Sequence, residues 1–252
     1  MSADMDDGDS QINQAERLPP GQVGAALSQA LPVRRSWFPF LPVLFLVGGI
    51  VAMAVDCPLA KWCLDCRWPA FVGELLQIGE SFGSGLGAAL VILAAFQLAP
   101  NRRWAIPRMV TITFGSGIAA VLVKLLVVRV RPHHFDFVGG VWQTFGEWLP
   151  IGSGGSGNQS FPSGHTAVAV GLAIALVWLF PRGFWWFLGL AVLAACQRVA
   201  SGAHYLSDVL FGAAVGSTVA LACFCVGPLS AWFDQWESSR KTKSRRVSTL
   251  TR

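Results

Sequence analysis

Charged side chains are scarce in this chain of 252 residues. Asp, Glu, Lys and Arg together make up 13% of it, about half of the roughly 25% found in an average soluble domain. Hydrophobic residues make up 53%, and the mean hydropathy is +0.52. So few charges could not cover the surface of a soluble protein, whereas lipid solvates the outer faces of membrane helices. The composition therefore excludes an ordinary cytosolic globule, a disordered chain, a collagen and a small disulfide scaffold.

The charges that are present are concentrated at the two ends of the chain. The middle, residues 38–233, holds 10 of the 19 Lys and Arg and 7 of the 14 Asp and Glu. Residues 1–36 combine Asp, Pro and Gly with too few clustered apolar residues to fold alone, which predicts a disordered cytoplasmic leader. The leader lacks the layout of a signal peptide, because the first apolar stretch follows Arg34 and Arg35 without a small-residue cleavage pattern.

Residues 37–233 form the predicted membrane domain, and residues 234–252 form a basic cytoplasmic tail. The basic residues of the tail are Arg240, Lys241, Lys243, Arg245, Arg246 and Arg252. Such a run is typical of a solvated segment on the cytoplasmic side, and a binding site for anionic lipid is the alternative. Nucleic acid is not an expected partner, because no folded reading module accompanies the run.

Six apolar stretches predict an all-α polytopic membrane helix bundle with about six transmembrane helices. They cover residues 38–55, 84–98, 107–128, 164–180, 184–199 and 206–226. Several of them are near the lower length limit for crossing a bilayer, so five or seven spans are also compatible with the pattern.

Basic residues fall on one side of these spans. Arg102, Arg103 and Arg108 join the second and third stretches, Arg182 joins the fourth and fifth, and both termini are basic near the membrane. The positive-inside rule places this side in the cytoplasm. Both termini are therefore expected in the cytoplasm, and the loops after the first, third and fifth stretches are expected to face outward.

Cysteine and histidine do not fall in a pattern that predicts a metal site. His133 and His134 have no carboxylate or Cys at ligand spacing, and the Cys63-x-x-Cys66 pair has no evident fourth ligand. We therefore expect no metal and no cofactor. Cys57, Cys63 and Cys66 fall in the first outward loop, where an oxidising compartment would permit one disulfide of unknown pairing. Free thiols are the alternative.

Three polar segments stand at the outward ends of the predicted spans: KLLVVRVRP at 124–132, PSGH at 162–165 and RVASGAHYLSD at 198–208. Lys124 and Arg131 are seven residues apart, so both project from one face if the helix continues to Arg131. They could then bind one anion together. A charge inside a span is costly and indicates function, although Lys124 alone could be a lysine that snorkels from a helix end.

The other two segments supply a helix cap and a paired histidine. Ser163 is a candidate N-cap whose following N–H groups point at an anion, and Gly164 lets the backbone come close. His204 and Asp208 are four residues apart, so on a helical turn the carboxylate would fix the imidazole tautomer and leave the other ring nitrogen nucleophilic. Arg198 adds a guanidinium suited to bidentate phosphate contact.

Together these segments resemble the signature of the type 2 phosphatidic acid phosphatase (PAP2) superfamily, K-x6-R-P, then P-S-G-H, then S-R-x5-H-x3-D. The matching residues are Lys124, Arg131 and Pro132 for the first motif, Pro162, Ser163, Gly164 and His165 for the second, and Arg198, His204 and Asp208 for the third. One departure is Gln197, which stands where the third motif has serine. The resemblance extends over about residues 83–226.

The resemblance implies an integral membrane lipid phosphatase that needs no metal. His204, oriented by Asp208, would attack phosphorus and form a phosphohistidine, and His165 would protonate the leaving oxygen and then activate water. The phosphate oxygens would be held by Lys124, Arg131, Ser163, Gly164 and Arg198.

The implied substrate is a lipid phosphate or diphosphate of the undecaprenyl diphosphate, phosphatidylglycerophosphate, phosphatidic acid or lipid A type. The implied location is a bacterial inner membrane, with the active site facing the periplasm or exterior. A lipid phosphotransferase that uses the same phosphohistidine is an alternative. A non-catalytic membrane binding or transport protein is less favoured, because His204, His165 and Arg131 are all present.

Overall fold

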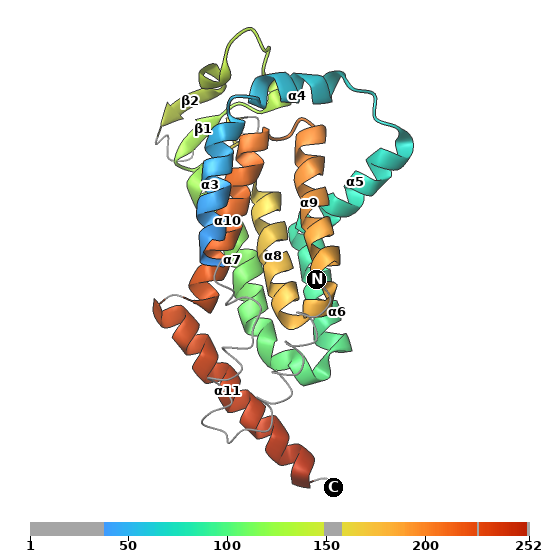
Figure 1. Cartoon of the computed structure of the whole chain (residues 1–252), viewed down its shortest axis with the longest axis vertical. Helices are drawn as coiled ribbons and strands as arrows, with labels where there is room; N and C mark the ends of the chain where they lie inside the picture. The colour runs from blue at the N-terminus through green and yellow to red at the C-terminus, as the bar shows by residue number, and fades with distance from the viewer. Residues whose placement is uncertain (1–37, 149–157, 226, 251–252) are drawn as a thin grey trace.

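The computed structural model describes residues 38–148, 158–225 and 227–250, so the predicted leader lies outside the described residues. Most of the helices run along the long axis of the molecule (Figure 1). They are α3 (Leu41–Ala52), α6 (Gly85–Leu98), α7 (Ile106–Lys124), α8 (Gly164–Leu179), α9 (Phe184–Ala200) and α10 (Leu206–Phe224). Each falls on one of the six predicted apolar stretches, which confirms the all-α membrane helix bundle.

The number of spans depends on how bent and short helices are counted. Three stretches are long and apolar enough to cross a membrane alone, and they cover residues 100–124, 181–200 and 206–224. Two helix pairs qualify only if each pair counts as one span, because they are bent by 76° and 72°. α8 is apolar but has only 16 residues. The described residues thus give three to five spans by length and composition, and six when α8 is included.

α8 forms the centre of the bundle. Its buried residues lie on all sides of the helix, from Ala167 to Leu179, and it contacts α7, α9 and α10. A helix that is apolar all round is expected in a core of this kind. By contrast, α3 has Val43, Leu44 and Val47 exposed on its outer face, as expected for side chains that contact lipid.

Glycines on α10 bring it close to α8. A Cβ atom on Gly212 would lie 2.4 Å from the carbonyl oxygen of Ser163, and one on Gly216 would lie 2.5 Å from that of Ala167. No side chain fits at either distance, so small residues are needed where the two backbones meet. This contact fixes the first turns of α10 against the first turn of α8.

The region between the first two predicted spans was predicted as a loop, and this prediction is wrong. It contains α4 (Asp56–Asp65), which crosses the end of the bundle, and α5 (Ala70–Gly83), which packs against α9 (Figure 1). Glu74, Gln77 and Glu80 interrupt the apolar pattern of α5, so it does not read as a membrane stretch. They make the helix amphipathic, and the helix forms because its apolar face is buried.

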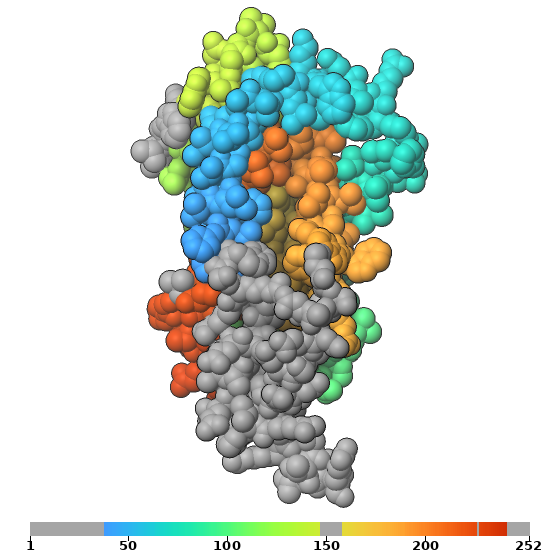
Figure 2. Space-filling view, in the orientation of Figure 1, coloured from blue at the N-terminus to red at the C-terminus, as the bar shows by residue number. Residues whose placement is uncertain are grey.

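The three cysteines of this region, two in α4 and one directly after it, are free thiols, which is the second of the two alternatives. Cys63 is buried and packs with Val199 and Val209 from α9 and α10, whereas Cys57 and Cys66 are only half-buried. Cys63 therefore acts as a small apolar side chain that holds α4 on the bundle. The space-filling view shows α3 and α4 covering the upper part of α10 on this face (Figure 2).

The third predicted span ends earlier than expected. α7 stops at Lys124 and not at Val128, and the chain continues into β1 (Val127–Arg129), which pairs antiparallel with β2 (Phe145–Trp148). Two physical reasons favour the change: Val127 and Val128 are β-branched, and Pro132 disfavours a helical conformation at the residue before it. Arg131 accordingly has an extended backbone.

A final helix, α11 (Gly227–Leu250), runs obliquely from the opposite end of the bundle to α4 (Figure 1). It continues through residue 233, where sequence analysis ends the membrane domain. Arg108 of α7 is 2% exposed and forms ion pairs with Asp234 at 2.6 Å and Glu237 at 2.9 Å. Its guanidinium also lies 5.2 Å from the ring centres of Phe224 and Phe233. These contacts attach α11 to the bundle.

Replacing Arg108 with Ala is expected to destabilise this attachment. The substitution leaves the buried Glu237 without its cation, and breaking a buried pair from one side costs about 3 kcal/mol. Thermal and denaturant unfolding in detergent should show the loss. Lys61→Ala removes an exposed cation from α4 and should change stability by about 0.5 kcal/mol or less. Equal stability of the two variants would show that the ion pairs of Arg108 do not hold α11 on the bundle.

Candidate active site

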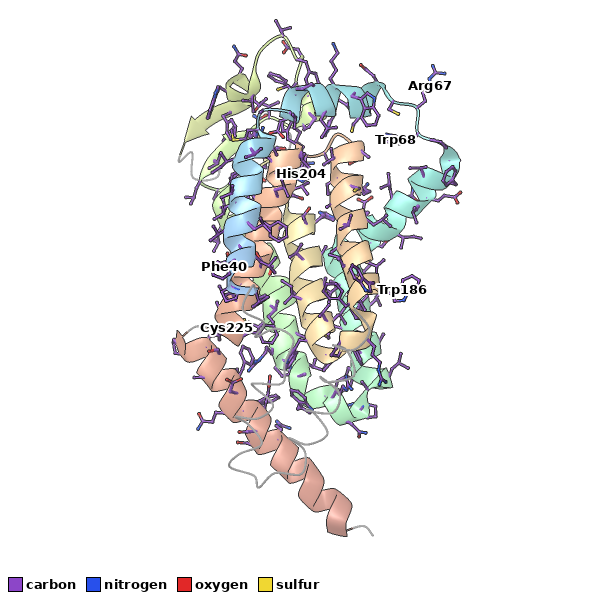
Figure 3. The ribbon with its side chains drawn as sticks, in the orientation of Figure 1. Phe40, Arg67, Trp68, Trp186, His204 and Cys225 are labelled. Atoms are coloured by element: carbon purple, nitrogen blue, oxygen red, sulfur yellow. The ribbon has the colours of Figure 1, made fainter. Side chains whose placement is uncertain are left out.

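The three predicted motif segments meet at the end of the bundle that α4 crosses. His204 lies there, beneath α4 and between the ends of α9 and α10, whereas Phe40 and Cys225 mark the opposite end (Figure 3). The first segment follows α7, the second begins α8, and the third joins α9 to α10. Residues that are 80 positions apart in the chain are thus brought to one place.

Ser163 caps α8 as predicted. Its hydroxyl oxygen accepts a hydrogen bond from the backbone N–H of Thr166 at 3.4 Å. Its own N–H donates to the carbonyl oxygen of Asp208 at 2.9 Å, so this N–H is already used within the protein. The N–H groups of Gly164 and His165 belong to the first helical turn, where no helix carbonyl can reach them. An anion at the helix start would therefore meet Gly164 and His165 rather than the N–H of Ser163.

Space is available beside Gly164. A Cβ atom built on this residue would meet no heavy atom of the described residues within 4 Å. Most other helical glycines of the bundle are packed against a neighbour, as Gly212 is. The open position next to two N–H groups is where a small anion could lie.

His204 and Asp208 form the predicted pair. The Nδ1 atom of His204 lies 3.8 Å from Oδ2 of Asp208, which is within ion-pair range but longer than a hydrogen bond. His204 precedes α10 instead of lying on it, so the pair forms across the helix start and not along a helical turn. Its N–H donates to the carbonyl oxygen of Arg198 at 3.1 Å, which ties the histidine to the end of α9.

Burial controls the ionisation of His204. The side chain is 5% exposed, and desolvation lowers the pKa of His204 below its usual 6.5, with Lys124 and Arg131 acting in the same direction and Asp208 opposing them. The imidazole is therefore neutral near pH 7. With Nδ1 directed at the carboxylate, Nε2 carries the lone pair.

Asp208 is held from several sides. Its Oδ2 atom accepts hydrogen bonds from the hydroxyl of Ser160 at 2.6 Å and from the N–H of Tyr205 at 3.0 Å, and the residue is fully buried. A carboxylate with this many donors stays in one orientation. It can therefore orient the imidazole of His204.

Three cations, Lys124, Arg131 and Arg198, lie near the pair formed by His204 and Asp208. Lys124 donates from Nζ to the carbonyl oxygen of Gln159 at 2.6 Å. The Nε atom of Arg131 is buried and makes no hydrogen bond within the described part of the chain. Burial, followed by the charge of Arg198, lowers the pKa of Arg131, so the two guanidinium groups are close enough to repel each other. An anion between such groups would be strongly attracted.

The convergence of Lys124 and Arg131 was predicted for a different reason. One continuous helix was expected to carry Lys124 and Arg131 on the same face. The helix instead ends at Lys124. Arg131 reaches the site from the extended segment after β1 instead. The predicted route is therefore wrong, although the charge of Arg131 acts on Lys124 and the two cations lie near each other.

Arg129, to which no sequence motif assigns a role, is fully buried behind the site. Its guanidinium pairs with Asp208 and, at 2.8 Å, with Asp56 of α4, and it donates to the hydroxyls of Thr144 and Ser207. The ring centres of Tyr205 and Phe145 lie 4.1 Å and 4.5 Å from it. Arg129 thus holds the carboxylate that faces His204.

Asp56 completes this network. One oxygen accepts the N–H of Ser207 at 2.9 Å, and the other accepts the hydroxyl of the same residue and pairs with Arg129. Asp56 therefore fastens the start of α4 to the start of α10. Asp56 and Arg129 each directly follow a predicted apolar stretch, and a charge next to a span could have marked both as candidates from the sequence.

The described residues contain no group of three or more His, Cys, Asp or Glu side chains arranged to hold a metal ion. The groups present are a neutral imidazole with a fixed carboxylate partner, three cations and two backbone N–H groups at a helix start. This set is suited to nucleophilic displacement at a tetrahedral anion, because the cations stabilise the charge while the imidazole attacks.

Comparison with known proteins gives a consistent result. Residues 105–232 match the model of the PAP2 superfamily. The chain is 36% identical to a lipid A 1-phosphatase of Rhizobium etli over 197 residues, which cover 71% of this chain and 81% of that protein. It is 39% identical to a lipid A 1-phosphatase of Rhizobium johnstonii over 98 residues, 39% of this chain and 38% of the relative.

A solved structure has a similar fold. The transmembrane PAP2 type phosphatidylglycerolphosphate phosphatase from Bacillus subtilis matches with a TM-score of 0.52 and 20% sequence identity. The match covers 72% of this chain and 93% of that chain. At this identity the likeness concerns the fold.

Replacing Arg129 with Met is expected to destabilise the protein by about 3–5 kcal/mol, because Asp56 and Asp208 would remain buried without their shared cation. Arg129→Lys keeps the charge but loses the forked donors, so its stability should be intermediate. Arg67→Met removes an exposed arginine and serves as the control. Unfolding in detergent measures all three, and a stable Arg129→Met variant would show that the network is dispensable.

Proposed function

Because the chain belongs to the PAP2 superfamily, we propose that this membrane phosphatase releases phosphate from a lipid phosphomonoester at the site around His204. The observation that carries the proposal is that three distant motif segments lie together at the start of α8, where the charges of Arg198, His204 and Lys124 act on His165. There, a buried and neutral imidazole lies near Lys124, Arg131 and Arg198.

A glycolipid phosphate of the lipid A type is the proposed substrate class. The two Rhizobium relatives are both lipid A 1-phosphatases, and one of them aligns with 71% of this chain. The position of the site supports a lipid substrate, because it lies where the bundle ends and α4 crosses it (Figure 1). A phosphate that remains attached to a bilayer-anchored lipid could reach this depth without leaving the membrane.

In the proposed first step, Nε2 of His204 attacks phosphorus and the bond between phosphorus and the lipid oxygen breaks. His165 gives its proton to the departing oxygen, so the lipid leaves as an alcohol and the phosphoryl group remains on His204. Asp208 stabilises the positive charge that the imidazole gains. In the second step His165 takes a proton from water, the water oxygen attacks phosphorus, the bond between phosphorus and Nε2 of His204 breaks, and inorganic phosphate leaves.

The proposed phosphate-binding groups are Lys124, Arg131, Arg198 and the N–H groups of Gly164 and His165. All of these are donors, so they stabilise the equatorial oxygens as charge redistributes in the transition state. Ser163 contributes by capping α8 and by linking it to α10, since its own N–H is bonded to Asp208.

We also propose that the site faces the periplasm or exterior of a bacterial inner membrane and that both termini are cytoplasmic. Arg102 and Arg182 lie in the connections before α7 and before α9, at the end of the bundle remote from α4 (Figure 1). The positive-inside rule assigns that end to the cytoplasm.

Phosphate release from purified protein in detergent tests the proposal. The substrates are lipid A, phosphatidic acid, phosphatidylglycerophosphate and undecaprenyl diphosphate, all with EDTA present, and lipid A is expected to be hydrolysed best. His204→Ala should lower kcat by a factor of about 10³ or more, because it removes the nucleophile. His134→Ala, which changes an exposed histidine nearby, should retain activity.

Two results would overturn this proposal. Activity that survives His204→Ala would exclude the phosphohistidine. Absence of phosphate release from every lipid by folded protein would exclude hydrolysis and favour transfer of the phosphoryl group to a second lipid.

The pH dependence of kcat gives a separate test of the nucleophile. His204 must be neutral to attack, and burial lowers the pKa of His204. Since protonation of His204 occurs only below this lowered pKa, any loss of kcat caused by that protonation should appear only below about pH 6.5, the usual histidine value. A fall of kcat with rising pH would instead report the proton that His165 must donate. An acid limb centred above pH 7 would contradict a neutral, buried His204.

A further inference from the structure

Arg198 is held by Glu80, which lies outside the motifs, and by Gln197, which stands in place of the serine of the third motif. Its Nη2 atom pairs with Oε1 of Glu80 at 2.6 Å, and its Nε atom donates to Oε1 of Gln197. The amide nitrogen of Gln197 donates to Oε2 of Glu80 at 2.9 Å. The three side chains therefore close a ring of hydrogen bonds in which every acceptor is matched by a donor.

The backbone around Glu80 is fixed by its neighbours. A Cβ atom on Gly79 would lie 2.4 Å from the backbone of Leu193 in α9, and one on Gly83 would lie 2.8 Å from the carbonyl oxygen of His165. α5 thus touches both α9 and the start of α8 on either side of Glu80. Such tight contacts leave the glutamate little freedom to move relative to Arg198.

We propose that Glu80 and Gln197 are positioning residues that orient Arg198 for phosphate binding. Gln197 stands where the family motif has serine, and the ring gives this departure a physical reason, since the longer side chain spans from Arg198 to Glu80. The inference rests on the proposed role of Arg198 in binding phosphate.

The geometry favours positioning over competition with the substrate. Gln197 accepts from Nε and Glu80 pairs with Nη2, so neither residue occupies Nη1 of the guanidinium. The charge of Arg198 acts on Arg131 and on His165, so this guanidinium is near the other site residues. The remaining donors can bind a phosphate oxygen while the ring stays closed.

The exposed fractions of the two side chains also favour a positioning role for Glu80. The side chain of Glu80 is 41% exposed and that of Arg198 is 10% exposed. Water therefore screens the repulsion between the Glu80 carboxylate and a bound phosphate, while the buried contact with Arg198 is screened less. Removing Glu80 should therefore weaken anion binding, because the loss of the hydrogen-bond ring around Arg198 outweighs the relief of repulsion between the Glu80 carboxylate and the anion.

Orthovanadate, a tetrahedral phosphate analogue, provides the probe. Its dissociation constant is measured by isothermal titration of the purified chain in detergent. Glu80→Ala should weaken binding about 10-fold, as expected for residues in one hydrogen-bond network, and Glu80→Gln, which keeps one acceptor oxygen, should weaken it less. Glu74→Ala removes an exposed carboxylate from the same helix and should leave binding unchanged.

A double-mutant cycle separates positioning from a general structural effect. If Glu80 acts through Arg198, Glu80→Ala should cause no further loss in an Arg198→Ala background. An equal loss in both backgrounds, or vanadate binding that becomes tighter in Glu80→Gln, would overturn the inference. So would the absence of vanadate binding by the unmodified chain.

Lipid phosphate release is measured on the same samples to keep the two proposals apart. Hydrolysis of lipid that is sensitive to His204→Ala, with no effect of Glu80 on vanadate, would overturn this inference alone. Vanadate binding that depends on Glu80, without hydrolysis of any lipid, would overturn the phosphatase proposal alone.

Discussion

The buried charge of Arg129 is the constraint on which the rest of the site depends. A guanidinium with no exposure must be neutralised and hydrogen-bonded where it lies. Asp56 and Asp208 neutralise it, and because they come from α4 and α10, the same contacts fix both helices against the β1 segment. Asp208 in turn faces His204. The ion pairs therefore set the position of the histidine that the proposed reaction uses.

Ionisable side chains in this membrane protein lie where the free-energy cost of burying their charge is offset by a partner. The spans hold few ionisable groups, and those of the site are gathered at one end of the bundle, where helix ends supply N–H groups as well. Arg108 shows the same rule at the other end, since it is buried only together with Asp234 and Glu237 of α11. Each buried cation is thus paired with carboxylates from a different helix.

Close helix packing gives the site its precision. Gly212 brings α10 onto the carbonyl of Ser163, and Gly79 and Gly83 bring α5 onto α9 and the start of α8. Backbones in direct contact have few alternative arrangements. The capped start of α8, the histidine pair and Arg198 are consequently held by backbone contacts as well as by hydrogen bonds. The stability of the bundle and the geometry of the site thus come from the same small residues.

The helix bundle and the motif residues were predictable from the sequence alone, because apolar stretches, a capping serine and a histidine–aspartate spacing are local patterns. The sequence did not reveal that α4 and α5 are helices, since burial against other helices decides this, or that the segment after α7 is a strand, since its partner β2 lies further along the chain. Only the tertiary structure joined Arg129 to Asp56 and Arg198 to Glu80. Such pairs are 73 and 118 positions apart in the chain, and no local pattern connects them.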